Sequence, residues 1–176
     1  MSVSLAEVPP MVIGGSIISV VSLIFHIIGF STTYWYILKN VVGVKIGHVG
    51  LWQECEPAYG RELCSDITGG QFAQFKATEA LECLALVAFV AAVICAFLKM
   101  FVLKERGILF VVTGLLNLIA GVIALIGVIV FATISSGGHM LDASNFHYSF
   151  WLCLVGGFGG MFSGIIFILA WRWVRN

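Results

Sequence analysis

Four long apolar segments dominate the pattern of hydrophobic and polar positions along the chain. Each is close to the roughly 20 residues that a helix needs to cross the hydrocarbon core of a bilayer. Each is apolar all round, which favours membrane-spanning helices over amphipathic helices of a soluble core. A transmembrane β-barrel would need short segments of alternating hydrophobicity, and these segments do not alternate. The expected spans are about 11–31, 80–101, 108–132 and 150–171.

The composition indicates that lipid is the solvent for much of the chain. Of the 176 residues, 60% are hydrophobic and 10% are charged, and the mean hydropathy is +1.06. A soluble domain carries about 25% charged residues, because charge covers its surface. The nine basic and nine acidic residues cancel, so no excess charge indicates a nucleic-acid partner. The length suits one four-span membrane domain over residues 1–176.

Basic residues are unevenly distributed between the predicted loops. They occur between the second and third spans and after the fourth, whereas the loop at about 133–149 has none. The loop at about 32–79 has four, but it is long and carries a similar number of acidic residues, so it weakens the bias without reversing it. Short basic loops stay in the cytoplasm, so we expect both termini inside the cell and the loops at about 32–79 and 133–149 outside. The basic residues concerned are Lys99, Lys104, Arg106, Arg172 and Arg175.

Two cysteines, Cys55 and Cys64, lie in a polar stretch of the first outer loop. Structural disulfides persist in the oxidising space outside the cell. Pro57 and Gly60 favour a turn between them, and a hairpin closed there would bring the thiols within reach of each other. With His48 the cysteines offer too few ligands for structural zinc, and their spacing is wider than that of a redox pair. We therefore expect a Cys55–Cys64 disulfide and no metal or cofactor.

The stretch VVGVKIGHVGLW, residues 41–52, is rich in β-branched residues interrupted by glycines. This pattern predicts one or two strands, with bulges or turns at the glycines. We expect a small sheet on the outer ends of the helices. Its expected apolar positions are Val42, Val44, Ile46, Val49 and Leu51.

Part of the first loop resembles the signature of a known superfamily. Trp35, then Gly50-Leu51-Trp52, then Cys55 and Cys64 are similar to the W-GLW-C-C pattern of the claudin and peripheral myelin protein superfamily. The order of four spans with a long first outer loop and a short second one is similar too. The specific motif covers residues 35–64, and the architecture covers the whole chain.

The resemblance implies an integral membrane protein with a left-handed bundle of four transmembrane helices and a small extracellular antiparallel β-sheet. It would place Leu51 and Trp52 at the bilayer surface, and the Cys55–Cys64 disulfide would join two strands. Interfacial anchoring would also suit Trp35, because aromatic rings favour that layer. Members of the superfamily are structural proteins and not enzymes, and the chain shows no nucleophile and base of its own.

Two functions are consistent with the resemblance. The first is a plasma-membrane protein of cell–cell junctions, which contributes to adhesion or a paracellular barrier by pairing with itself or related tetraspans in cis and in trans. The alternative is an auxiliary subunit of a channel or receptor, or a myelin-protein-like membrane organiser. Glu79, in KATEAL, favours the alternative, because claudins of epithelial barriers usually have arginine there. The end RWVRN offers no motif for a PDZ domain.

A few further residues are candidates for packing or charge. Gly156, Gly160 and Gly164 form a GxxxGxxxG pattern that lets another helix approach closely, most simply within the bundle. His26 stands alone in its span, so we expect it to be neutral and hydrogen-bonded. Glu79 and Glu82 are expected at the N-terminal end of the second helix, where carboxylates complement the dipole. Asp66 and Lys76 are the candidate loop charges, and His139, Asp142 and His147 are expected to be solvated.

Overall fold

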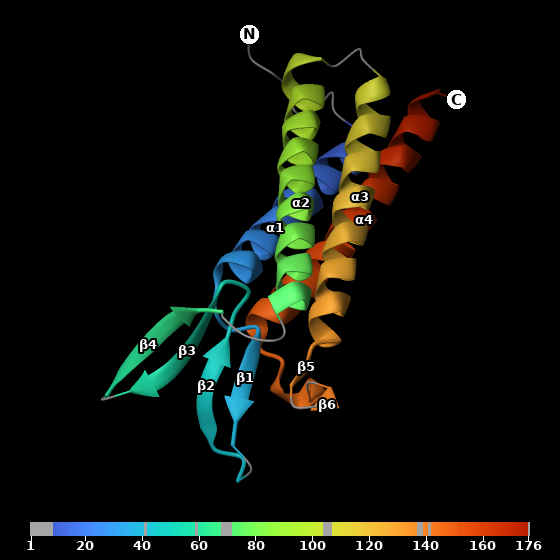
Figure 1. Cartoon of the computed structure of the whole chain (residues 1–176). Coiled ribbons are helices and arrows are strands. Elements are labelled where there is room, and N and C mark those ends of the chain that lie inside the picture. The colour runs from blue at the N-terminus through green and yellow to red at the C-terminus, as the bar shows by residue number, and fades with distance from the viewer. Residues whose placement is uncertain are drawn as a thin grey trace.

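Four long helices form a bundle in the computed structural model, which describes residues 9–40, 42–58, 60–67, 72–103, 107–136, 139–140 and 142–175. The start of α1 and the end of α4 lie at the end of the bundle away from the sheet (Figure 1). All four helices are long and apolar enough to cross a membrane. The helices are α1 Pro10–Ser31, α2 Phe72–Phe97 with the π-helical turn η2 Leu98–Val102, α3 Ile108–Ala132 and α4 Tyr148–Arg175.

The second helix begins earlier than the hydropathy pattern predicts. Its apolar part was expected from about residue 80, but α2 starts at Phe72. The extra turns have the sequence FAQFKATE. This stretch is too polar to be recognised as part of an apolar span, but it still forms helix. Glu79 and Glu82 therefore lie well inside α2, and the expectation that they complement the dipole at its N-terminal end is wrong.

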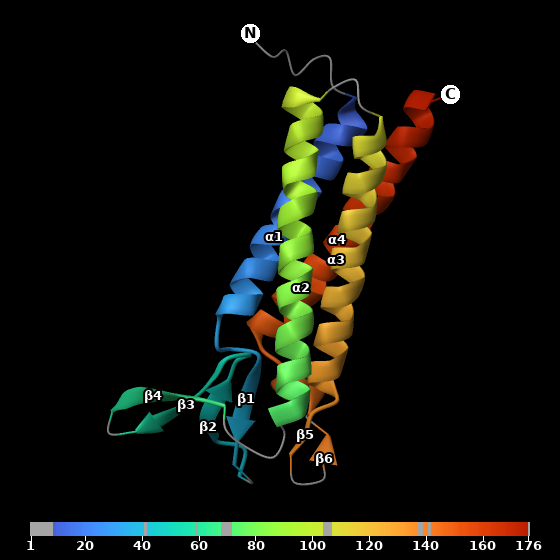
Figure 2. The ribbon, with the colours of Figure 1, turned by 45° about the horizontal axis from the view of Figure 1, so that its top comes forward.

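The segment between α1 and α2 forms a four-stranded antiparallel sheet, which confirms the small antiparallel sheet that the resemblance implied. The strands follow chain order, so that each pairs with the next. Figures 1 and 2 show the sheet at one end of the bundle, with the β3–β4 hairpin reaching sideways away from the helices. The strands are β1 Tyr36–Lys39, β2 Lys45–Val49, β3 Gln53–Ala58 and β4 Arg61–Asp66.

The part of the chain between α3 and α4, which we call the second outer segment, is short and lies beside the sheet. It contains the two-residue strands β5 Ser135–Ser136 and β6 His139–Met140, followed by the 3-10 turn η3 Ala143–Asn145. Phe146 forms an isolated antiparallel bridge with Tyr36 of β1. The two outer segments are therefore connected directly through their backbones.

The burial pattern of α1 is the reverse of that in a soluble helix. Apart from Val12, its buried positions are small or polar, namely Gly15, Ser16, Ser19, Ser22, His26 and Gly29. Its exposed positions include Ile17, Val21 and Ile24. An exposed face of large apolar side chains is stable only against lipid, and small residues are what lets transmembrane helices approach each other. This arrangement, with the four spans, makes the chain a multi-pass membrane protein.

The three glycines of the GxxxGxxxG pattern face different neighbours within the bundle. A Cβ on Gly156 would lie 3.0 Å from the carbonyl oxygen of Ser22 in α1. One on Gly160 would lie 2.5 Å from the ring of Phe89 in α2, and one on Gly164 2.6 Å from Leu118 in α3. A step of four residues overshoots a helical turn by about 40°, so the small positions rotate around α4 from one neighbour to the next.

Candidate functional site

The sheet is attached to the bundle through the C-terminal end of α1. The last four carbonyl groups of a helix have no partner within it. Thr32 Oγ1 donates to the carbonyl oxygen of Ile28 at 2.6 Å. Trp35 Nε1 donates to that of Gly29 at 2.8 Å, and Trp52 Nε1 to that of Phe30 at 2.9 Å. Both tryptophans of the sequence signature therefore cap α1.

The two tryptophans differ in their surroundings. Trp35 is fully buried, and its ring lies 4.8 Å from that of Phe131 and 6.1 Å from that of Phe150. Trp52 is 37% exposed and meets Phe30 edge-on, with centroids 5.1 Å apart. A side chain without exposed surface does not contact lipid, so the expectation of interfacial anchoring is wrong for Trp35. Trp52 has the exposure that such anchoring requires.

Gly50 and Leu51 hold the end of β2 close to the chain that leaves α1. A Cβ on Gly50 would lie 2.5 Å from the Cα of Thr33, so only glycine fits at this crossing. Leu51 is fully buried among the side chains that join sheet and helices. It contributes to this core and not to the bilayer surface, where the resemblance had placed it. The core consists of Trp35, Tyr36, Val49, Leu51, Phe75, Val128, Phe131, Ile134, Phe150 and Cys153.

The disulfide lies in the part of the sheet that extends away from the helices. Cys55 of β3 and Cys64 of β4 are directly opposite in the strand register and form a disulfide. Cys55 is fully buried, whereas all six residues of β4 are exposed. The disulfide therefore adds to the backbone pairing with β3 in holding β4, whose side chains are all exposed.

The opposite edge of the sheet is covered by the second outer segment. The hydroxyl of Tyr36 accepts hydrogen bonds from the backbone N–H of Asp142 at 3.2 Å and from Asn145 Nδ2 at 3.3 Å. The backbone N–H of His147 donates to the carbonyl oxygen of Trp35 at 3.0 Å. Hydrogen bonds from Ser144 lower the pKa of the Asp142 carboxyl, which is exposed, as expected. The edge of β1 is thus occupied.

An aromatic and histidine cluster joins β2 to the residues just before β1 and α4. His48 is buried and stacks on Tyr34 with ring centroids 3.9 Å apart, and His147 lies 5.4 Å from Tyr34. Burial lowers the pKa of His48, partly opposed by the Glu62 carboxylate and reinforced by Lys45 and His147. His147 is half-buried and packed on an aromatic ring, so the expectation that it is solvated is wrong. The side chain of His139 lies outside the described residues.

The comparison with protein families agrees with this geometry. Residues 10–167 match the PMP-22/EMP/MP20/Claudin family. The chain belongs to this family. A comparison with curated proteins found no match. Its family is one of structural membrane proteins and not of enzymes, and in this member the signature residues hold the sheet on the end of α1.

The two candidate loop charges of this family member lie in different elements. Asp66 is the last residue of β4, where it is exposed opposite Gln53. Lys76 lies in the second turn of α2, and its Nζ is 2.6 Å from Glu79 Oε2. Lys76 therefore belongs to a helix and not to the loop in which the sequence placed it, and part of its charge is balanced by Glu79.

The sequence context of His26 suggested that no other ionisable group lies near it, but the structure places Glu82 beside it. Its Nδ1 lies 3.6 Å from Glu82 Oε2, with both side chains fully buried between α1 and α2. The two residues are 56 positions apart. Their pairing depends on the register of α2 against α1, which no spacing in the sequence encodes. The nearby thiol of Cys153 in α4 completes a group of three possible metal ligands.

Proposed function

We propose that the protein is a claudin-like structural protein of the plasma membrane at cell–cell contacts. Its termini lie in the cytoplasm and the sheet outside the cell, where lateral and trans assembly contributes to adhesion or a paracellular barrier. The observation that carries this function is the exposed edge of β4. Within the described part of the sheet β4 pairs only with β3, whereas β1 is covered by the second outer segment. An unpaired strand edge is a ready template for another chain.

Exposed apolar side chains on the sheet support both kinds of assembly. Leu63 on β4 is 60% exposed, in the strand that offers the free edge. Val42, at the turn between β1 and β2, is 80% exposed, and Val44 and Ile46 beside it are exposed too. This turn is at the end of the sheet farthest from the bundle (Figure 1). Leu63 suits a neighbour in the same membrane, and the turn suits a protein on the opposing cell.

Expression of the full chain in cells that lack junctions tests this function. We expect enrichment at contacts between expressing cells and continuous strands in freeze-fracture images. Leu63→Arg should remove the strands, because it places a charge at the lateral edge. Val42→Arg is the matched control, which should keep strands within one cell and weaken adhesion between cells. A uniform surface distribution of the wild type, with adhesion and permeability unchanged, would count against the proposal.

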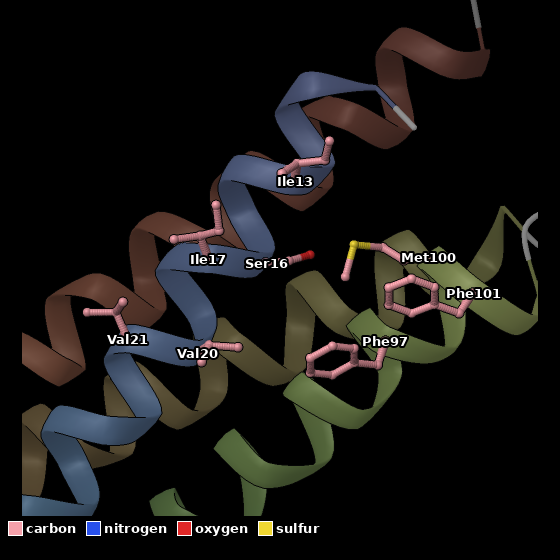
Figure 3. Close-up of a pocket in the computed structure, with 8 residues that line it drawn as sticks. All are labelled: Ile13, Ser16, Ile17, Val20, Val21, Phe97, Met100 and Phe101. Atoms are coloured by element: carbon pink, nitrogen blue, oxygen red, sulfur yellow. The ribbon is translucent and has the colours of Figure 1, made fainter. Parts of the chain in front are cut away.

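An apolar groove between α1 and α2 favours the second candidate, a regulatory subunit of a channel or receptor. It has a volume of about 280 Å³ and lies between the first half of α1 and the C-terminal end of α2 with η2. Ser16 and Met100 point toward each other across it, and Phe97 and Phe101 form one wall (Figure 3). Such a groove suits side chains of a partner's transmembrane helix. Its lining is Ile13, Ser16, Ile17, Val20, Val21, Phe97, Met100 and Phe101.

Copurification in mild detergent distinguishes the two candidates. Stable capture of one channel or receptor, lost in Ile17→Trp because the larger side chain fills the groove, would favour the regulatory subunit. Homotypic assemblies that survive Ile17→Trp and are lost in Leu63→Arg would favour the structural protein of cell contacts. Val87→Trp, at an exposed position of α2 outside the groove, controls for the added bulk.

A further inference from the structure

Three chemically different side chains meet inside the bundle, each from a different helix. They are His26 of α1, Glu82 of α2 and Cys153 of α4, and all are fully buried. Their ligand atoms, one imidazole nitrogen, one carboxylate oxygen and one thiol sulfur, all lie within 4.8 Å of one another. We call this group the buried triad. His26 lies five residues before the end of α1, so the triad is near the end of the bundle that carries the sheet.

The facing atoms of His26 and Glu82 have no hydrogen-bond partners, whereas Cys153 Sγ donates to the backbone carbonyl oxygen of His26 at 3.9 Å. His26 Nε2 lies 3.1 Å from the backbone carbonyl oxygen of Glu82. A carbonyl only accepts, so Nε2 carries the proton and Nδ1 presents a lone pair. That lone pair faces Glu82 Oε2 at 3.6 Å. Neither Nδ1 nor either carboxylate oxygen has a hydrogen-bond partner. Buried acceptors that face each other are costly unless a positive species lies between them.

We propose that the buried triad binds a divalent zinc ion. Zinc accepts imidazole nitrogen, carboxylate oxygen and thiolate sulfur in tetrahedral geometry at about 2.0–2.3 Å. Those bond lengths put neighbouring ligand atoms roughly 3.3–3.7 Å apart, which agrees with the 3.6 Å between His26 Nδ1 and Glu82 Oε2. The Cys153 sulfur lies within 4.8 Å of both atoms, so zinc binding requires it to move by about 1 Å. The fourth position is left for water.

Charge balance explains why a divalent ion suits a site within the membrane. A carboxylate and a thiolate contribute two negative charges, which Zn²⁺ cancels, so the occupied site is neutral. An uncompensated charge would carry a large desolvation cost there. Binding releases two protons to solvent, the thiol proton of Cys153 and the proton that His26 and Glu82 share in the metal-free protein, because zinc requires the thiolate, the imidazole lone pair and the carboxylate. The Nε2–H of His26 already donates to a carbonyl, as the outer nitrogen of a zinc-bound histidine does.

The surrounding helices are shaped to accommodate the triad. A Cβ on Gly127 of α3 would collide with Glu82 Oε1, and one on Gly29 of α1 would lie 2.6 Å from Cys153 Sγ. The rings of Phe89 and Phe30 lie 5.2 Å and 6.2 Å from that of His26. Glycines provide room for the ligands and aromatic rings keep other polar groups away. A bound ion would connect α1, α2 and α4 close to the end of α1 that the two tryptophans cap.

Metal content of the purified full chain tests the site directly. The chain should be prepared in mild detergent with an affinity tag that contains no histidine, equilibrated with Zn²⁺ and washed. We expect about one zinc per chain by elemental analysis and a rise of several degrees in the unfolding midpoint when zinc is added. Cys153→Ser and Glu82→Gln should lose the zinc and the rise. Cys95→Ser, in α2 outside the triad, should keep both.

Cobalt gives a second measurement that does not depend on variants of the ligands. The variant Cys83→Ser/Cys95→Ser leaves Cys153 as the only free thiol, because Cys55 and Cys64 form the disulfide. Co²⁺ bound to it should show a sulfur-to-cobalt charge-transfer band and the strong visible bands of tetrahedral coordination. Absence of these bands, absence of zinc in the wild type, or equal zinc in folded Cys153→Ser would each overturn the proposal.

Discussion

The indole Nε1 of Trp35 donates a hydrogen bond of 2.8 Å to the carbonyl oxygen of Gly29, six residues earlier in the chain. Trp52 makes the equivalent bond to Phe30. A pair of tryptophans separated by an entire hairpin therefore satisfies consecutive carbonyl groups at one helix end. Because one partner in each bond belongs to the helix and the other to the outer segment, these bonds set the position of the sheet on the bundle.

Trp35→Phe is expected to destabilise the protein more than Trp52→Phe. Both substitutions remove a donor, but Trp35 is fully buried and Trp52 is 37% exposed. Water can replace the lost donor only at the exposed site. Loss of the donor to the buried carbonyl of Gly29 should therefore lower the free energy of unfolding by about 1–3 kcal/mol. Unfolding of each variant in mixed micelles measures the difference. An equal loss of unfolding free energy in the two variants would show that burial of the Trp35 hydrogen bond does not make it more stabilising than that of Trp52.

Gly50→Ala should be strongly destabilising, whereas Gly14→Ala should not. A Cβ on Gly50 would lie 2.5 Å from the Cα of Thr33, but one on Gly14 would meet nothing within 4 Å. Forcing the backbones apart at Gly50 should cost about 1–3 kcal/mol. Alanine at Gly14 in α1 should be neutral or stabilise by up to about 1 kcal/mol through helix propensity. The same unfolding assay checks both, and a neutral Gly50→Ala would contradict the close crossing.

Removal of the disulfide should act locally on the β3–β4 hairpin. In the chain-entropy account, closing so short a loop contributes about 2–3 kcal/mol. All six residues of β4 are exposed, so few contacts transmit the loss to the helices. For Cys55→Ser/Cys64→Ser we expect faster hydrogen exchange in β3 and β4 and unchanged exchange in α3. Non-reducing mass mapping of the wild type should find Cys55 joined to Cys64, and free thiols there would contradict the pairing.

The outer part of the protein should lose stability in mild acid because of His48. Burial lowers the pKa of His48 in the folded protein below the value of 6.5 of an unperturbed histidine. Between 6.5 and the lowered pKa the unfolded chain binds a proton that the folded chain does not, so stability falls as pH falls through this window. Lys45 and His147 reinforce the effect, and the Glu62 carboxylate opposes it.

His48→Phe provides the matched comparison for this pH dependence. The phenyl ring can keep the stack on Tyr34 but cannot take up a proton. We expect the unfolding midpoint of the wild type to fall more between pH 7.5 and pH 5 than that of the variant. Parallel pH profiles for the two proteins would exclude His48 as the responsible group.

Much of the fold follows from hydropathy and the loop signature, but the strands are harder to predict. The four spans are continuous apolar runs of the length that crosses a bilayer, which identifies them as membrane helices. By contrast, β4 has the sequence RELCSD and is exposed on both faces, so it lacks the alternation that identifies a strand. Val42 was expected among the apolar positions of the sheet, yet it is 80% exposed at a turn.

The buried polar residues were the least predictable part of the candidate site. The spans were expected to be apolar all round, yet Ser19 Oγ of α1 donates to Asn117 Oδ1 of α3 at 2.8 Å. A few small polar residues barely change the mean hydropathy of a span, so the inward face of a membrane helix gives a weak signal. Glu82 was misplaced for a related reason, because hydropathy marks where a helix becomes apolar and not where it begins.

The rotating small face of α4 has a consequence for biosynthesis. The ribosome completes α4 after the other three helices, yet Gly156 and the Ser163–Gly15 hydrogen bond of 2.8 Å show that α4 supplies the wall against which α1 rests. Until α4 enters the membrane, the serines and histidine of α1 lack this cover. A chain halted before α4 would therefore expose polar side chains of α1 to the lipid, where they are costly, so the incomplete protein should be less stable in the membrane than the finished one.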